Sequence, residues 1–353
     1  MPVIYTVTAF NGTTAQYQVM AFVHDTENEK SILSFVIEEP FVEGIIDEAA
    51  KTVTLKFPVG TDVSNLTPII IVSEGATIEP ASGMTQDFTE PVNYTVTALN
   101  GTSMVYVVSA IVEDPNQPII KKVLLEDFTG VRCVNCPAAG ELALQLQETY
   151  PQLIVLGVHA GMLSMPNGGY PDFRTPEGTE WWNFFGFDAN PIGTVDRVLS
   201  GTGRYGLNPA DWATFIVDEI AKDPVIALKI ENTYNADNRT LNVTVSGKVL
   251  IDQLDDLNLV VCLMEDGITG LQQTPDGVNP DYVHRHVFRG TLDGLAWGLS
   301  IGTAPFAEGF TFEKTYSYTL PEDFEAENCA VVAYVCQDSD KTVLQVEEAE
   351  VIE

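Results

Sequence analysis

The stretch "EDFTGVRCVNCPAAGELALQLQETYP", residues 126–151, decides how the second half of this chain folds. An apolar strand-like run precedes Cys133 and Cys136, and a segment with helical spacing follows them, in which Leu142 and Leu146 share one face. The next segment, "QLIVLGVHAG", is a near-continuous apolar run, as expected for a buried parallel strand. The order predicts a βαβ unit, with the cysteine pair at the junction of its first strand and its helix.

A cysteine pair at a helix N-terminus suits thiol–disulfide chemistry. Unpaired backbone N–H groups and the helix dipole stabilise a thiolate there, so we expect Cys133 to be an exposed nucleophile of lowered pKa. Cys136, one turn further, would act as the resolving thiol. Arg132 would help to keep the first cysteine ionised. Glu126, in preference to Asp127, would take a proton from Cys136 as a partly buried carboxylate.

Two other interpretations of the pair stay open. A structural zinc site needs two further ligands at suitable spacing, and the sequence has no second CxxC motif. A permanent disulfide brace needs nothing more than the pair. Of the other cysteines, Cys329 and Cys336 are seven apart in one expected strand and should face opposite sides. A bridge from Cys262 to either remains open, but the odd total of five leaves at least one free thiol.

The amino-terminal part of the chain contains a repeat. Residues 3–23 and 92–112 share 13 of 21 aligned positions, and each copy has an Asn-Gly turn between alternating strands, which is a strong hairpin signal. We therefore expect residues 24–112 to be a complete all-β module. Residues 1–23 would be the last hairpin of a preceding module, with Asn11 in its turn.

The remaining chain divides by pattern. Residues 119–222 alternate strands and helices and predict an α/β domain, whereas residues 223–353 predict a C-terminal β-sandwich. The segment 162–190 is a long insertion rich in glycine, proline and aromatic residues. It forms either a lid or partner-binding rim beside the cysteines, or an aromatic cap on the domain interface, and we favour the cap.

The composition excludes several functions. Fifty acidic and 17 basic residues give a formal charge of −33, which disfavours nucleic-acid binding. No apolar run reaches the roughly 18 residues of a membrane helix, and no signal peptide is visible at the start. The P-loop, HExxH, serine-elbow and dinucleotide fingerprints are absent from the sequence, so we expect no cofactor.

The "HRH" sequence is a weak candidate metal site. His284 and His286 would lie on the same face of a strand, and two imidazoles at that spacing can bind a metal ion. No cysteine or acidic partner is close in sequence, so we prefer structural histidines.

Four motifs in order, "VLLEDFTGVRCVNCPAAG", "NPIGTVDR", "DYVHRHVFRG" and "ENCAVVAYVCQDSDKTVLQVEEAEV", make residues 119–353 resemble the outer-membrane-protein-28-related lipoproteins of Gram-negative anaerobes. Residues 31–112 resemble the immunoglobulin-like repeats of surface proteins from such bacteria. These resemblances imply an immunoglobulin-like sandwich, then a thioredoxin-like domain, then a β-sandwich. They also imply attachment to a membrane from the periplasm or the cell surface, through an anchor in a missing N-terminal segment.

The thioredoxin-like pattern carries over to Cys133, Cys136 and Pro191, with Pro191 held cis against the disulfide. Arg132 departs from that pattern, which usually has tryptophan before the first cysteine. Two hypotheses follow. The chain is an exported or membrane-anchored thiol–disulfide protein whose partners are protein thiols or disulfides, or it is a non-catalytic surface binding protein or adhesin that uses the domain as a scaffold for a surface ligand. Whether it is an enzyme is left open.

Overall fold

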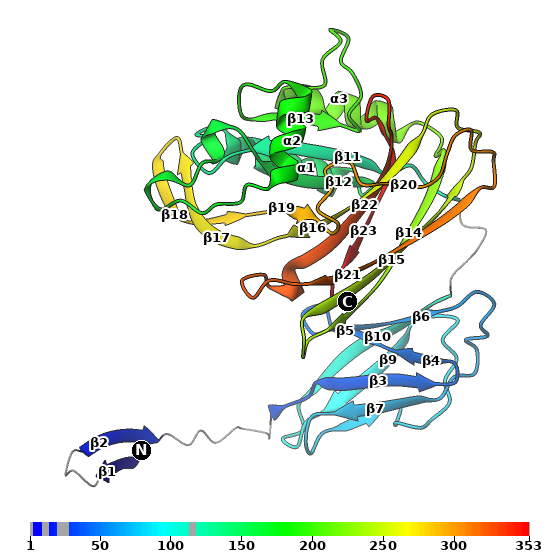
Figure 1. Cartoon of the computed structure of the whole chain (residues 1–353). Coiled ribbons are helices and arrows are strands. Elements are labelled where there is room, and N and C mark those ends of the chain that lie inside the picture. The colour runs from blue at the N-terminus through cyan, green and yellow to red at the C-terminus, as the bar shows by residue number, and fades with distance from the viewer. Residues whose placement is uncertain (1–2, 9–13, 20–27, 113–117, 353) are drawn as a thin grey trace. The chain divides into compact units, whose positions relative to one another are not determined.

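The structure is a computed structural model that describes residues 3–8, 14–19, 28–112 and 118–352 (Figure 1). The chain forms two compact units, Met1–Gln117 and Pro118–Glu353. No helix among the described residues is long and apolar enough to cross a membrane.

The chain starts with a separate hairpin. Strands β1 (Val3–Thr8) and β2 (Thr14–Val19) pair antiparallel, and within the described residues they form a two-stranded sheet of their own. The expected turn residue Asn11 lies outside the described residues. The hairpin agrees with the repeat, while its origin in a preceding module stays a prediction.

Residues 28–112 form two facing sheets, of order β4-β3-β7 and β5-β6-β10-β9-β8. Burial alternates along β6 and β9, as in strands with one face on a core, and Phe35, Phe88 and Tyr94 meet in that core. The predicted all-β sandwich is what the structure shows. Its strands are β3 (Ile32–Glu38), β4 (Phe41–Glu43), β5 (Ile45–Asp47), β6 (Thr52–Phe57), β7 (Pro68–Val72), β8 (Thr77–Glu79), β9 (Val92–Thr97) and β10 (Ser103–Val112).

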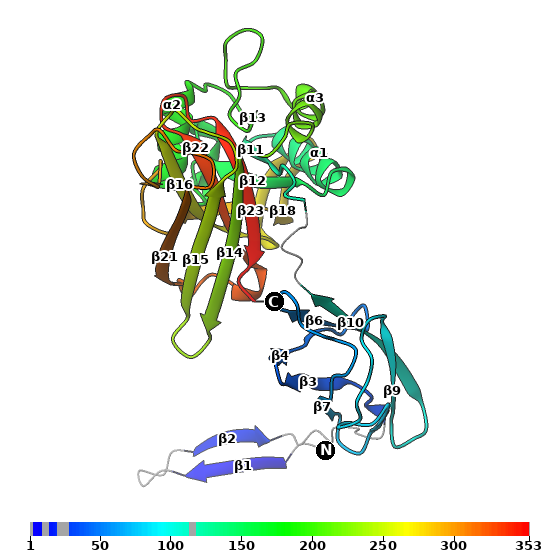
Figure 2. The same ribbon diagram turned by 90° about the vertical axis from the view of Figure 1, so that its right-hand side faces the viewer.

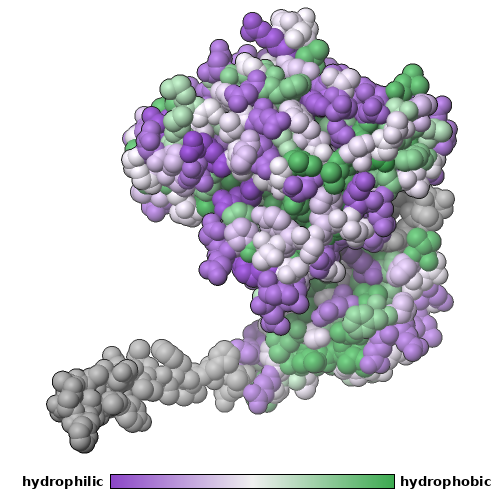
Figure 3. Space-filling view, viewed as in Figure 1, coloured by the Kyte–Doolittle hydropathy of each residue, from purple (hydrophilic) through white to green (hydrophobic). Residues whose placement is uncertain are grey.

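One surface of this unit is apolar. Figure 3 shows hydrophobic residues on its visible face, and the exposed apolar side chains of sheet β4-β3-β7 are Leu33, Phe41, Ile69 and Ile71. Exposed patches of this kind often mark contact surfaces.

The second unit begins with the predicted βαβ arrangement. Strands β11 (Val123–Thr129) and β12 (Leu153–His159) are parallel and joined by helix α1 (Cys136–Thr149). After helix α2 (Pro176–Phe185), strand β13 (Ile192–Val195) adds antiparallel to the other edge of β11, and helix α3 (Pro209–Ile220) follows.

The remaining strands complete a large sheet, form a smaller three-stranded one, and add the separate antiparallel hairpin β17-β18. The large sheet has the order β13-β11-β12-β19-β16-β22-β23, with β20 also paired to β16, and the smaller has the order β14-β15-β21 (Figure 2). The strands are β14 (Ile226–Asn235), β15 (Thr240–Val249), β16 (Leu257–Glu265), β17 (Ile268–Thr274), β18 (Gly277–His284), β19 (Val287–Thr291), β20 (Leu299–Ser300), β21 (Thr311–Thr319), β22 (Cys329–Gln337) and β23 (Val343–Glu350).

The large sheet runs across the domain boundary that we expected at residue 222. Every residue of β12 is buried, so the strand needs a neighbour on both edges, and β19 supplies the second through Gly157 and Val287. Residues 119–222 and 223–353 therefore share one sheet and one compact unit instead of forming two. The pattern change at 222 marks a change of local structure and no domain boundary, because β19, the strand that pairs with β12, begins 128 residues after β12 ends.

The two faces of the large sheet have different covers. One face carries a continuous core under α2, to which β11, β12, β16 and β22 all contribute. The opposite face is covered by α1 and α3 at the β11–β12 end and by sheet β14-β15-β21 at the other. Alternate residues of β11 consequently enter two different cores.

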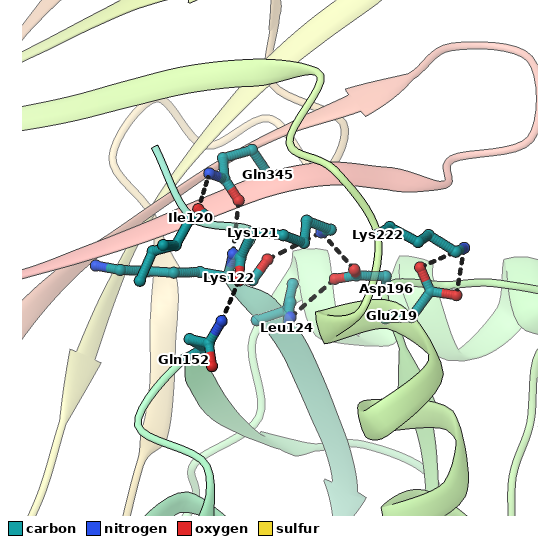
Figure 4. Close-up of polar contacts among 9 residues, drawn as sticks. All are labelled: Ile120, Lys121, Lys122, Leu124, Gln152, Asp196, Glu219, Lys222 and Gln345. Carbon is teal, nitrogen blue, oxygen red and sulfur yellow. Dashed lines mark hydrogen bonds and ion pairs between the residues drawn. The ribbon is translucent and has the colours of Figure 1, made fainter. Parts of the chain in front are cut away.

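Asp196 and Arg197, which follow β13, tie the large sheet together. Asp196 accepts hydrogen bonds from Lys121 Nζ at 2.5 Å and from the Leu124 backbone N–H at 2.8 Å (Figure 4). Its backbone carbonyl accepts from the N–H of Val343 at the start of β23. Arg197 is fully buried and forms a two-pronged pair with Glu126, with Nε and Nη2 2.9 and 2.6 Å from the two carboxylate oxygens.

The buried pair predicts a large stability effect. We expect Glu126→Gln to lower the free energy of unfolding by about 3–5 kcal/mol, because it leaves the Arg197 charge buried without its carboxylate. Urea unfolding measures the loss. The matched control is Asp172→Asn, which breaks the half-exposed pair with Arg174 and should cost no more than about 1 kcal/mol. Equal losses in the two variants would contradict this account of the core.

Candidate functional site

The cysteine pair lies at the carboxyl end of β11, as predicted, and forms the Cys133–Cys136 disulfide. Helix α1 begins at Cys136, with Asn135 as N-cap and Pro137 in the first turn. Cys133 therefore lies three residues ahead of the first helical residue, and Cys136 is the cysteine at the helix N-terminus.

Pro191 has the predicted cis peptide bond, which joins it to Asn190. The Asn190 side chain fixes this turn beside the carboxyl ends of β11 and β12, because Nδ2 donates to the carbonyl oxygens of Phe128, Thr129 and Ala160 at 3.0–3.3 Å. The register pairs Ile192 with Phe128, so Pro191 lies next to the last residue of β11.

The expectation that Cys133 is exposed is wrong. Cys133 is 2% exposed and Cys136 is 3% exposed. The β17–β18 hairpin covers the cysteine loop: Gln272 Nε2 donates to the carbonyl oxygens of Gly130 and Cys133 at 3.2 and 3.0 Å, and the Gln273 backbone N–H donates to Val131 at 2.8 Å. No sequence pattern indicates this cover, since the hairpin lies more than 130 residues further along the chain.

The insertion 162–190 has two parts with different roles. Near its start, the Leu163 carbonyl accepts the Arg132 backbone N–H at 2.9 Å, and the Tyr170 hydroxyl donates to Gln273 of the covering hairpin at 3.2 Å. The aromatic part forms α2, and Trp181 and its aromatic neighbours pack into the core of the large sheet. The expected aromatic cap agrees with this second part, whereas the first part helps to hold the cover over the cysteines.

Arg132 has a backbone role in this arrangement. Within the part of the chain that the structure describes, its side chain is partly buried and enters no ion pair, and its backbone anchors the cysteine loop to Leu163. With the pair oxidised, the structure gives Arg132 no contact that supports the expected electrostatic role.

Glu126, the expected proton carrier, lies on the wrong face of β11. Together with Leu124 and Phe128, it points to the core under α2, where it binds Arg197 and accepts a hydrogen bond from Thr194 Oγ1 at 2.7 Å. Glu126 therefore has a structural role. Alternation along the strand turns its neighbour Asp127 to the opposite face, which α1 and the cysteines cover.

Asp127 has the environment that we expected for Glu126. It is 4% exposed, its Oδ1 has no hydrogen-bond partner among the described residues, and burial raises its pKa to about 7. It lines a cavity of about 220 Å³ together with Cys136. A carboxyl group with this pKa beside a cysteine can accept or return a proton near neutral pH.

Two histidines that the sequence analysis did not pair complete the cavity. The rings of His159, at the end of β12, and His284, at the end of β18, lie 5.8 Å apart. Burial lowers the pKa of His159 to about 3, helped by the proximity of His284, and burial lowers that of His284 to about 4. Both rings are therefore neutral at physiological pH. His159 Nδ1 and His284 Nε2 lack hydrogen-bond partners among the described residues.

His284 and His286, the weak metal candidate, do not lie on one strand. The strand ends at His284, and His286 has a positive φ of 52° and lies 3.0 Å from Gln147 Oε1 through Nε2. Among the described residues, no group of three or more histidine, cysteine or acidic side chains is arranged to hold a metal ion.

The other three cysteines are buried and free. Cys336 and Cys262 lie in the core under α2, and Cys329 lies in the core on the other side of the sheet, so the predicted opposite facing of Cys329 and Cys336 is confirmed. Burial raises the pKa of Cys329 to about 12 and that of Cys336 to about 11. These thiols are thus protonated at neutral pH and poorly reactive.

Solved structures that are similar to this chain include two from Porphyromonas gingivalis. HBP35 of that organism is 18% identical, with a TM-score of 0.54, over 67% of this chain and 77% of its own, so the likeness concerns the fold alone. A domain of the outer membrane lipoprotein Omp28 is 24% identical over 37% of this chain and 90% of its own, with a TM-score of 0.26. A comparison with curated protein sequences found no significant match.

Two protein families match parts of the sequence. Residues 32–110 match the family described as SGBP, N-terminal, which fits the expected surface-protein module. Residues 179–353 match the family described as outer membrane protein Omp28, whose description suggests the cell envelope. The second match starts after the cysteine pair and includes the "NPIGTVDR" and "DYVHRHVFRG" motifs. Over residues 179–353, just under half of the chain, the sequence therefore resembles the outer membrane protein Omp28 family.

Proposed function

We propose that this chain is a cell-envelope protein that carries out thiol–disulfide exchange at Cys133 and Cys136 in a thioredoxin-like part of residues 118–353. The family match supports the location, at the outer membrane surface or in the periplasm. The reaction interconverts a disulfide and two thiols, with protein or small-molecule thiols as its class of partner.

The order of elements supports the thioredoxin-like assignment. A central strand leads to the cysteine pair, the pair opens a helix, and the helix returns to a parallel strand. A cis proline then precedes an antiparallel strand on the other side of the central one, followed by a final helix. Sheet, helix and proline thereby converge at the carboxyl end of β11.

The observation that carries the proposal is Asp127. A structural disulfide has no use for a buried, unpaired carboxyl group, and burying one costs stability. In an exchange site, the Cys136 thiol must lose its proton before its sulfur attacks, and Asp127 shares a cavity with that residue. A carboxyl group whose pKa is about 7 can take this proton and return it when the pair is reduced again.

The burial of both Cys133 and Cys136 favours a second candidate function. In this candidate the disulfide braces the cysteine loop, and the protein binds a ligand at the cell surface. The exposed apolar side chains on sheet β4-β3-β7 support a contact role for the amino-terminal unit.

Catalysed exchange distinguishes the two candidates. With dithiothreitol as reductant and a fluorescence-quenched small-molecule disulfide as substrate, the wild-type chain should accelerate exchange about tenfold or more over the uncatalysed reaction. A Cys133→Ser, Cys136→Ser double variant should give only the background rate, while Cys262→Ser should react like wild type because that thiol is buried. A wild-type rate equal to that of the double variant would leave the brace as the explanation.

Asp127 also predicts how stability depends on pH. The folded chain keeps this proton up to about pH 7, whereas the unfolded chain loses it near 3.8, so the unfolded state binds fewer protons between these values. Asp127 should therefore make the free energy of unfolding fall as pH rises from about 4 to about 7. In Asp127→Asn this decline should be smaller, and the variant should be the more stable chain at pH 8, by on the order of 1–3 kcal/mol.

Urea unfolding at several pH values measures this effect. Asp237→Asn, in an exposed turn, is the control and should keep the wild-type pH profile. If Asp127→Asn also keeps that profile, the carboxyl group is ionised in the folded chain at ordinary pH and is not poised to carry a proton.

A further inference from the structure

The two cysteines differ in what lies over them. On the Cys133 side, Gln272 and Gln273 of the β17–β18 hairpin bond the carbonyl oxygens of the cysteine loop, and the Leu163 carbonyl accepts a backbone N–H from it. A folded protein partner would have to displace this hairpin to reach the disulfide. Cys136, in contrast, lines the cavity of about 220 Å³ described above.

The cavity connects the disulfide with solvent. Its inner wall is formed by the buried residues Asp127, Cys136 and His159, and its outer wall includes Glu141 and Arg285, both exposed to solvent. Its volume lies below the range of about 300–1,000 Å³ that is usual for drug-sized ligands, so it suits a small molecule and is too small for a protein segment.

The polar groups of the cavity are arranged for a ligand. Asp127 Oδ1, His159 Nδ1 and His284 Nε2 are buried and lack protein partners among the described residues, although buried polar atoms are normally paired. At the mouth, Glu141 is negative and Arg285, which also pairs with Asp266 at 3.3 Å, is positive, and the two complement a molecule that carries both an ammonium and a carboxylate group.

We propose that the disulfide exchanges with a small zwitterionic monothiol of about the size of cysteine, which enters this cavity and attacks Cys136 Sγ. The proposal rests on the proposed thiol–disulfide function and specifies its substrate class. It reverses the roles expected from the sequence, since Cys136 is the attacked sulfur and Cys133 the leaving one.

The step is balanced as follows. The incoming thiol gives its proton to the Asp127 carboxylate, and its sulfur forms a bond to Cys136 Sγ while the Cys133–Cys136 bond breaks. Cys133 leaves with the electron pair as a thiolate and takes up one proton, which replaces the one that Asp127 releases again. A second monothiol attacks the sulfur of the bound one, and its proton passes to the Cys136 thiolate that leaves, which yields the small-molecule disulfide and the second protein thiol. Two thiols are oxidised and one protein disulfide is reduced.

Gly140 of α1 offers a way to block the cavity without disturbing the fold. It lines the cavity, and a Cβ there would meet only the Tyr282 hydroxyl oxygen, at 3.9 Å. Gly140→Leu should fill the space, whereas Gly140→Ala leaves most of it open and is the matched control, and both substitutions favour the helix.

The test measures the rate of reduction of the disulfide by free cysteine and, separately, by reduced thioredoxin, followed by alkylation and mass measurement. Reduced thioredoxin must displace the β17–β18 hairpin, so it should reduce the wild-type disulfide more slowly than cysteine does, and Gly140→Leu should leave that rate unchanged. Gly140→Leu should slow reduction by cysteine at least tenfold, while Gly140→Ala should stay within twofold of wild type for both reductants. If Gly140→Leu slows neither reductant, or slows both equally, the cavity route is overturned and the thiol–disulfide function stands. If neither reductant opens the wild-type disulfide, the proposed function itself fails.

A labelling experiment checks the attacked sulfur independently of the cavity variant. The Cys133→Ser chain, treated with cystine, should gain one half-cystine adduct on Cys136. The Cys136→Ser chain should gain at least tenfold less on Cys133, and the buried Cys262 serves as an internal reference in both. Faster labelling of Cys133 than of Cys136 would overturn the assignment.

Discussion

The buried pair of Arg197 and Glu126 is the constraint on which the second unit depends. A guanidinium group that is fully removed from water is tolerated only with a well-placed carboxylate and further partners, and Tyr334 supplies one of these at 2.6 Å from Nη2. The ring of Trp181 lies 5.0 Å from the guanidinium carbon. The pair joins β11 to the end of β13 and both to β22, and so fixes the strand that Pro191 precedes.

The same pair determines which carboxyl group can serve the cysteines. Adjacent residues of a strand point to opposite faces. Because Glu126 forms its ion pair with Arg197 on one face of β11, Asp127 must point to the other face, toward α1. The first carboxylate is neutralised by a cation, while the second is buried without one, which raises its pKa to about 7. Two neighbouring acidic residues thus acquire a structural and a proposed chemical role from strand geometry alone.

Local patterns in the sequence predicted the local structure well. The βαβ unit, the hairpin-rich amino-terminal module, the position of the cysteine pair and the cis bond at Pro191 all follow from periodicity or from family motifs. What the sequence did not show depends on distant contacts. The single large sheet needs β19 beside β12, and the cover over the cysteines needs Gln272, which carries no signal in the sequence. The choice of Glu126 over Asp127 failed because no local pattern shows which face Arg197 occupies.

The reduction potential of the Cys133–Cys136 disulfide tests the central claim most directly. Equilibration with glutathione or dithiothreitol buffers, followed by alkylation and mass measurement, gives this value. A disulfide that takes part in exchange should have a potential between about −270 and −120 mV, the range of thioredoxin to strongly oxidising exchange proteins. A potential below about −300 mV is the mark of a structural disulfide and would contradict the assignment of this site to thiol–disulfide exchange.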